Sequence, residues 1–339
     1  MAAPTITSTA PPLQVALGRR RALAWAAGVA ALAATTYAVA PSFGELGEAV
    51  GRLDEARPWW LGAVLALEAL SIAGYVALFR AVYRPHSGRV GWRASYEISL
   101  ASLGAASKLP APAGAGSLAL VAWALRRAGL PSGAVARGMV AFFAVLYGVY
   151  MAALAAGGLG LHLGVLPGES GGALTLVPAL VALAAIAAAL ALAARRPRAD
   201  RPRRGRLVAA ADVVGDGVRS GLALARARQG GLGGAVAWWT FDALALWAAF
   251  AALGAPPAVA VVILAYLIGM AGDLLPLPGG VGGVEGATVA ALALLGVEAG
   301  PALVAVLIWR LGNFWIPTIP GAAALIGLRR SAARWTAAN

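Results

Sequence analysis

Six runs of about 20 apolar residues divide this 339-residue chain, and short arginine-rich segments separate most of them. A helix of that length crosses the hydrocarbon core of a bilayer. Charged residues make up only 12% of the chain, whereas soluble domains contain about a quarter. We predict an all-α polytopic membrane protein with spanning helices at about 22–40, 59–83, 135–160, 173–194, 231–253 and 301–328.

The arginines indicate which ends of these helices face the cytoplasm. Segment 195–206 contains seven arginines, and residues 19–21, 80–93 and 329–334 are also rich in arginine, whereas segment 161–172 contains no lysine or arginine. Cytoplasmic loops carry the excess of basic residues, and alternating helices place every arginine-rich segment on one side. We therefore predict an integral protein of the plasma (inner) membrane with both termini in the cytoplasm.

The remaining segments complete a single membrane domain over residues 19–334. Residues 1–18 are small or polar and include prolines, which predicts a disordered N-terminal tail. A cytoplasmic arginine-rich loop is expected at 195–230. Within it, stretch 207–228 mixes apolar and charged residues at helical spacing. That spacing favours a helix on the membrane surface or, equally, a solvated connector helix.

The composition also limits the kinds of site that the chain can build. It contains no cysteine and two histidines, so disulfides and thiolate metal sites are excluded, and we expect no metal and no cofactor. The net charge of +13 follows from the arginines between the apolar runs. We therefore predict no nucleic-acid partner.

Proline and glycine interrupt two further apolar regions, residues 94–128 and 259–295. The first interruption contains KLPAPAGAG and the second contains LPLPGGVGG. The runs beside each interruption have about 12 to 16 residues, which is too short to cross a bilayer. Irregular backbone at membrane depth needs protein or a polar cavity around it. Both regions are therefore predicted to be re-entrant helical hairpins whose tips lie inside the protein.

The two interruptions match each other without gaps. The pattern Leu-Pro-x-Pro-x-Gly-x-Gly occurs at 109–116 and again at 275–282. The charge pattern places the base of the first hairpin in the cytoplasm and the base of the second outside. The units at about 59–160 and 231–328 then form an inverted repeat, a design typical of transporters.

Broken helices and intramembrane charges provide the candidate binding residues. A half-helix that starts at a break has unpaired amides and a positive dipole end, which suits an anion such as a lipid phosphate. Ionisable side chains inside a membrane are costly and are therefore candidates for function. Besides Glu68, Glu97 and Arg137, we predict a substrate-binding and translocation site made of Lys108, Pro110, Gly114, Gly116, Asp242, Asp273, Pro276, Pro278, Gly279, Gly280, Gly282, Glu285 and Arg310.

Structural roles are open for several of these side chains. Glu285 could compensate the start of its helix and pair with Arg310. Lys108 could extend to the cytoplasmic face. Four tryptophans are predicted to be membrane-interface anchors: Trp59, Trp60, Trp238 and Trp239.

The motif LPLPGGVGGVEG, followed by WRLGNFWIPTIPG at 309–321, resembles the lysylphosphatidylglycerol synthase transmembrane family, the MprF flippase-like proteins. Its second-half signature reads P-x-P-G-G-x-G-x-x-E-G with an arginine further on. The residues that match it are Pro276, Pro278, Gly279, Gly280, Gly282, Glu285, Gly286 and Arg310. The first half departs from the family pattern P-x-R-x-G-E, because it keeps Pro110, Pro112 and Gly114 but lacks the arginine and the glutamate.

The resemblance implies a lipid flippase or transporter that moves a phospholipid or a lipid-linked head group between leaflets. Its partner would be a membrane lipid with an anionic or zwitterionic head group, and homo-oligomerisation is left open. The aminoacyl-transferase domain of the bifunctional proteins is not expected after Arg334. A stand-alone member that is not an enzyme is therefore expected.

Two other functions stay open. An intramembrane aspartyl protease needs two embedded aspartates that share a proton. Asp242, Asp273 and the tripeptide PAL at 301–303 follow the order of its motifs. A non-transporting accessory of cell-envelope biosynthesis is also compatible with the sequence.

Overall fold

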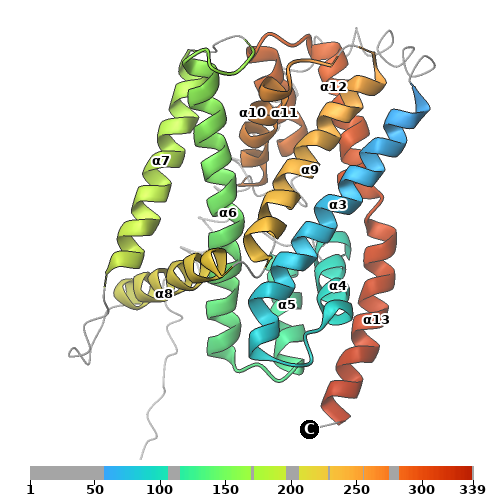
Figure 1. Ribbon diagram of the computed structural model, residues 1–339. Coiled ribbons are helices and arrows are strands. Elements are labelled where there is room, and N and C mark those ends of the chain that lie inside the picture. Colours follow the sequence, from blue (N-terminus) through green and yellow to red (C-terminus); the bar gives the residue numbers. More distant parts are fainter. Residues whose placement is uncertain are drawn as a thin grey trace, which may run out of the picture.

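The computed structural model describes residues 57–105, 115–168, 172–195, 206–227, 230–254, 256–274 and 282–337. In this part of the chain every regular element is helical and none is a strand (Figure 1). The predicted all-α polytopic membrane fold is confirmed. The predicted tail at 1–18 and the first predicted span at 22–40 lie outside the described residues.

Five helical segments of the described chain are long and apolar enough to cross a membrane, and they correspond to the five other predicted spans. The last of them is continuous from α12 through a π-helical turn at Leu311–Trp315 into α13. The long elements are α3 (Pro58–Tyr83), α6 (Ser132–His162), α7 (Ala173–Ala194), α9 (Gly231–Ala252), α12 (Ala299–Arg310) and α13 (Thr318–Ala337).

Helices α3 and α9 form an antiparallel pair through the middle of the bundle (Figure 1). The amide of Arg57 before α3 donates to the carbonyl of Ala252 at the end of α9, and Ser71 Oγ donates to the carbonyl of Trp238 at 2.9 Å. Gly74 and Gly234 face each other where the helices cross. Small residues allow helix backbones to approach closely in membranes, so this pair fixes the crossing point.

The Gly74 contact leads to the first testable prediction. A Cβ at position 74 would lie 2.7 Å from the carbonyl oxygen of Gly234, whereas a Cβ at Gly62 on the same helix meets nothing within 4 Å. Gly74→Ala is expected to lower the free energy of unfolding by about 1–3 kcal/mol through overpacking. Gly62→Ala is expected to raise it by up to about 1 kcal/mol, because alanine favours helix. Thermal unfolding in detergent measures both variants. A change in stability in the same direction for both would contradict the close contact between Gly74 and Gly234.

Four short helices occupy the two interrupted regions: α4 (Trp92–Leu100) and α5 (Ala115–Arg127) in the first, and α10 (Val259–Gly269) and α11 (Gly283–Leu294) in the second. The two pairs lie at opposite ends of the bundle (Figure 1). Helix α4 passes into a π-helical turn at Ala101–Ala105, and α10 into a 3-10 turn at Met270–Leu274. The tips at 106–114 and 275–281 lie outside the described residues, so re-entrant passage stays a prediction.

The stretch predicted as an amphipathic or connector helix forms α8 (Arg206–Arg226), which crosses α6 and α7 at a steep angle (Figure 1). Arg219 pairs with Asp216 and donates to the carbonyls of Ala193 and Arg195 at 2.7 and 3.0 Å. It thereby satisfies carbonyl groups at the end of α7, which lack partners within that helix. Helix α8 is therefore tied to the membrane domain, whereas its place on the membrane surface stays a prediction.

Candidate functional site

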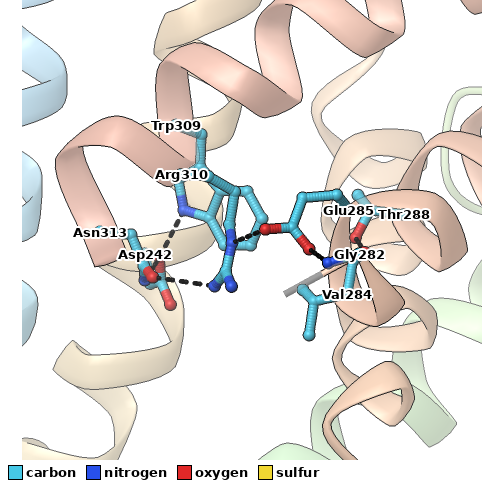
Figure 2. A network of polar contacts seen from close by, with 8 residues as sticks. All are labelled: Asp242, Gly282, Val284, Glu285, Thr288, Trp309, Arg310 and Asn313. Carbon is cyan, nitrogen blue, oxygen red and sulfur yellow. Dashed lines mark hydrogen bonds and ion pairs between the residues drawn. The ribbon is translucent and has the colours of Figure 1, made fainter. Parts of the chain in front are cut away.

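A buried aspartate on α9 is the centre of a polar network inside the bundle (Figure 2). Asp242 is 0% exposed. Its Oδ1 accepts hydrogen bonds from Trp309 Nε1 at 2.6 Å and from Asn313 Nδ2 at 2.8 Å, and its Oδ2 accepts one from the hydroxyl of Tyr266 at 2.7 Å. A buried carboxylate without partners would cost several kcal/mol. The three donors belong to α10, to α12 and to the π-helical turn after α12. Their hydrogen bonds offset the cost of burying Asp242.

Two donors reach one carboxylate from the junction between α12 and the π-helical turn. Trp309 lies in the last turn of α12, and Asn313 lies in the π-helical segment that follows it. Residues four apart lie on one helix face, so both side chains reach the same partner. Turns of this kind occur often at functional sites.

An ion pair joins this network to the second interruption (Figure 2). Arg310 Nε donates to Glu285 Oε1 at 2.8 Å, and the amide of Gly282 donates to Glu285 Oε2 at 2.8 Å. Gly282 has a φ of 84°, a conformation that favours glycine. Glu285 therefore caps α11 and holds Arg310 at the same time. The cap at the start of α11 and the ion pair with Arg310 are the two contacts expected if Glu285 has a structural role.

The network also leaves charged atoms without partners in the described part of the chain. Arg310 is 5% exposed, and its Nη2 has no hydrogen-bond partner there, although Nη1 reaches Asn313 Oδ1 at 3.4 Å. Glu68 on α3 is 4% exposed, and its Oε1 also has no partner there. A Cβ on Gly312 would lie 3.5 Å from Glu68 Cγ, so α3 packs directly on the π-helical turn. Buried polar atoms normally have partners, so such exceptions indicate a functional cluster.

A cavity of about 250 Å³ lies between α3, α5, α6 and α9. Residues beside both interruptions line it: Ser102 and Ser117 flank the first, and Met270 and Asp273 precede the second. Ser117 Oγ donates to the carbonyl of Ser102 at 2.9 Å, which ties the two sides of the first interruption together. The cavity therefore connects the two halves of the predicted repeat.

The structure separates the predicted site residues into three groups. Asp242, Gly282, Glu285 and Arg310 belong to the network. Asp273 lines the cavity, and Gly116 lies in the first turn of α5 beside the lining residue Ser117. The residues outside the described part of the chain are Lys108, Pro110, Gly114, Pro276, Pro278, Gly279 and Gly280.

Two other intramembrane candidates lie apart from this network. Glu97 on α4 accepts hydrogen bonds from Arg93 at 3.0 Å and from Ser331 at 2.8 Å. These contacts tie α4 to α13, which is a structural role. Arg137 is exposed near the start of α6.

The prediction of interface anchors is wrong for two tryptophans. Trp239 is 6% exposed and donates to the carbonyl of Leu146 at 2.7 Å, and Trp238 lines the cavity with it. Both lie on the central helix α9, which packs against neighbours on several sides. Trp59, by contrast, is 60% exposed at the start of α3, as an anchor would be.

Sequence reasoning missed three uncharged members of the network: Tyr266, Trp309 and Asn313. The segment WRLGN at 309–313 did contain a signal for two of them. Trp309 and Asn313 both have side-chain donors and lie four residues apart, which places them on one side of a helix. Tyr266 lies within a uniformly apolar segment and carried no such signal.

Comparison with known proteins places the chain in a family. No curated protein matches it. The family model described as the lysylphosphatidylglycerol synthase TM region matches residues 20–321, which is most of the chain. The apolar helices and this match together show an integral membrane protein. The chain therefore belongs to the lysylphosphatidylglycerol synthase transmembrane family.

Proposed function

We propose that this protein is a lipid transporter that moves a phospholipid or a lipid-linked head group between the leaflets of the plasma membrane. The observation that carries the proposal is the cavity that residues beside both interruptions line. In transporters built from inverted repeats, substrate sites lie where the broken helices of the two repeats meet. A cavity bounded by Ser102, Ser117 and Asp273 fits that design. Membership of a family named for a lipid synthase supports a lipid as the substrate.

The charged network supports a switching role next to this cavity. Glu285 belongs to α11, Asp242 to α9 and Arg310 to α12, so the network joins the second interruption to two spanning segments. A movement of α11 would alter the pairing of Arg310. Alternating access arises when one such unit rocks against the rest of the bundle.

The arginines support an orientation for this transport. Arg126 and Arg127 end α5, and Arg329, Arg330 and Arg334 lie in the second half of α13, at the same end of the bundle (Figure 1). The opposite end includes Glu298 before α12. We assign the arginine-rich end to the cytoplasm, as the bias of basic residues favours.

Catalysis is less well supported than transport. An aspartyl protease would need Asp242 and Asp273 to act together on a peptide and a water molecule. Asp242 has no exposed surface and is held by three donors, whereas Asp273 lines the cavity. We therefore propose that the protein transports lipid, does not cleave peptides and needs no cofactor.

Transport of labelled phospholipids between the leaflets of liposomes tests this function. Ser117→Phe is expected to reduce the transport rate to that of protein-free liposomes, because the new ring would fill a cavity of about 250 Å³. Ser220→Phe on α8 is the matched control, since Ser220 is exposed and does not line the cavity. Purified protein that moves no labelled lipid, or a Ser117→Phe variant with an unchanged rate, would contradict the proposal.

A further inference from the structure

Aromatic side chains line much of the cavity between the two interruptions. Eight of its lining residues are Phe, Tyr or Trp, contributed by α3, α6 and α9. Tyr75 lies 4.9 Å from Trp238 between ring centroids, with the planes tilted by 54°, and Tyr147 lies 6.1 Å from Trp239 with a tilt of 48°. The cavity is therefore lined largely by aromatic rings packed at tilted angles to one another.

The faces of these rings favour a positive charge. An aromatic face carries negative electrostatic potential, and ammonium groups bind over Trp and Tyr faces within about 6 Å. A group of aromatic rings is the usual receptor for a quaternary ammonium ion. An apolar lipid tail would also fit among aromatic rings. The charge beside the rings therefore decides whether the cavity suits a cationic group or a tail.

Asp273 supplies that charge. It is the one ionisable carboxylate among the described residues that line the cavity, and none of those residues is an arginine or a lysine. Asp273 is exposed, unlike Asp242, and its carboxylate forms no ion pair with any described residue. A phosphate would meet a carboxylate here without a counter-charge from the described lining, which is unfavourable. A cation would meet a carboxylate and several ring faces.

We propose that this cavity binds the positively charged end of a zwitterionic lipid head group, an ammonium or quaternary ammonium, between the aromatic rings and Asp273. The inference rests on the proposed transport function and narrows its substrate class from anionic or zwitterionic lipids to zwitterionic ones. Tyr147 offers an exposed ring on α6, and Asp273 offers the charge next to the second interruption.

Binding of short-chain lipids to the purified full-length protein in detergent tests the proposal. The probes are dihexanoyl phosphatidylcholine, dihexanoyl phosphatidylglycerol with the same tails, and choline chloride, each below any micelle-forming concentration. Tryptophan fluorescence follows binding, because Trp238 and Trp239 line the cavity. The phosphatidylcholine probe is expected to bind, and the phosphatidylglycerol probe to bind at least about tenfold more weakly.

Two variants and their controls locate the bound group. Asp273→Asn and Tyr147→Leu are each expected to weaken phosphatidylcholine binding by about tenfold. Tyr147→Phe keeps a ring and is expected to weaken binding less than Tyr147→Leu does. Glu298→Gln removes an exposed carboxylate outside the cavity and is expected to bind as the unmodified protein does.

Several outcomes would overturn the proposal: equal binding of both lipids, binding unaffected by Asp273→Asn, or choline chloride binding as tightly as phosphatidylcholine. The last would assign the cavity to a free quaternary ammonium ion. Liposome transport separates this inference from the proposed function. Transport of phosphatidylglycerol without phosphatidylcholine would keep the function and overturn the inference. Selective phosphatidylcholine binding without transport of any lipid would keep the inference about the bound group and overturn the proposed transport function.

Discussion

Arg310→Ala is expected to abolish lipid transport and to lower the free energy of unfolding by about 3–5 kcal/mol. Arg310 is 5% exposed and donates to Glu285 Oε1 at 2.8 Å. Removing the guanidinium leaves Glu285, whose side chain is only 15% exposed, without that partner, which is the costly way to break such a pair. The change also removes the link between α12 and α11. Liposome transport and thermal unfolding in detergent measure the two effects.

A paired variant separates stability from transport. In Glu285→Gln/Arg310→Gln no charge is left unpaired, and the glutamine at 285 still offers an oxygen to the amide of Gly282. This double variant is expected to recover most of the lost stability and none of the transport. Full transport by the double variant would show that the pair only holds α11 in place. Full transport by Arg310→Ala would contradict the site assignment altogether.

The charged half of this site was predictable because charge inside a membrane is costly. Glu285 and Arg310 stand out in a chain with few ionisable residues, and Gly282 lies within a run of proline and glycine. The sequence left two roles open for Glu285, substrate binding and structural pairing with Arg310, and the contact between the two side chains belongs to the second. The sequence also predicted that Glu285 compensates the start of its helix. The particular contact with the amide of Gly282 was not predictable, because it depends on the left-handed conformation of Gly282.

The uncharged residues that α9 and α10 contribute to the site were not predictable for a different reason. Helix α9 is apolar around its whole circumference, so periodicity does not distinguish the face that meets lipid from the face that meets α3 and α6. The sequence therefore predicts interface anchors at Trp238 and Trp239, whereas tertiary packing places both at a cavity. The same ambiguity concealed Tyr266 within α10.

Long apolar runs predicted the five candidate spans of the described chain, because length and apolar composition decide whether a helix is able to cross a bilayer. The π-helical turn at Leu311–Trp315 has no such signature. Pro317 and Pro320 follow it, but they predict a boundary and not the register that brings Asn313 to Asp242. That register depends on partners from α9, which are distant in the sequence.

Asp242→Asn is expected to lower the free energy of unfolding by about 3–5 kcal/mol. An asparagine presents an NH₂ group where the aspartate offers an acceptor. At least one of the three donors, Tyr266, Trp309 or Asn313, then faces another donor in a site with no exposed surface. Hydrogen bonds to a charged group are also stronger than those to a neutral amide.

Asp273→Asn is the matched control for this prediction, because it makes the same chemical change at a carboxylate that lines a cavity. Its effect on thermal unfolding is expected to stay within about 0.5 kcal/mol, as for surface substitutions, while its effect on ligand binding is large. Tyr266→Phe, which removes one donor, should cost about 1–2 kcal/mol. Equal effects of Asp242→Asn and Asp273→Asn on stability would contradict the separation of a structural aspartate from a binding one.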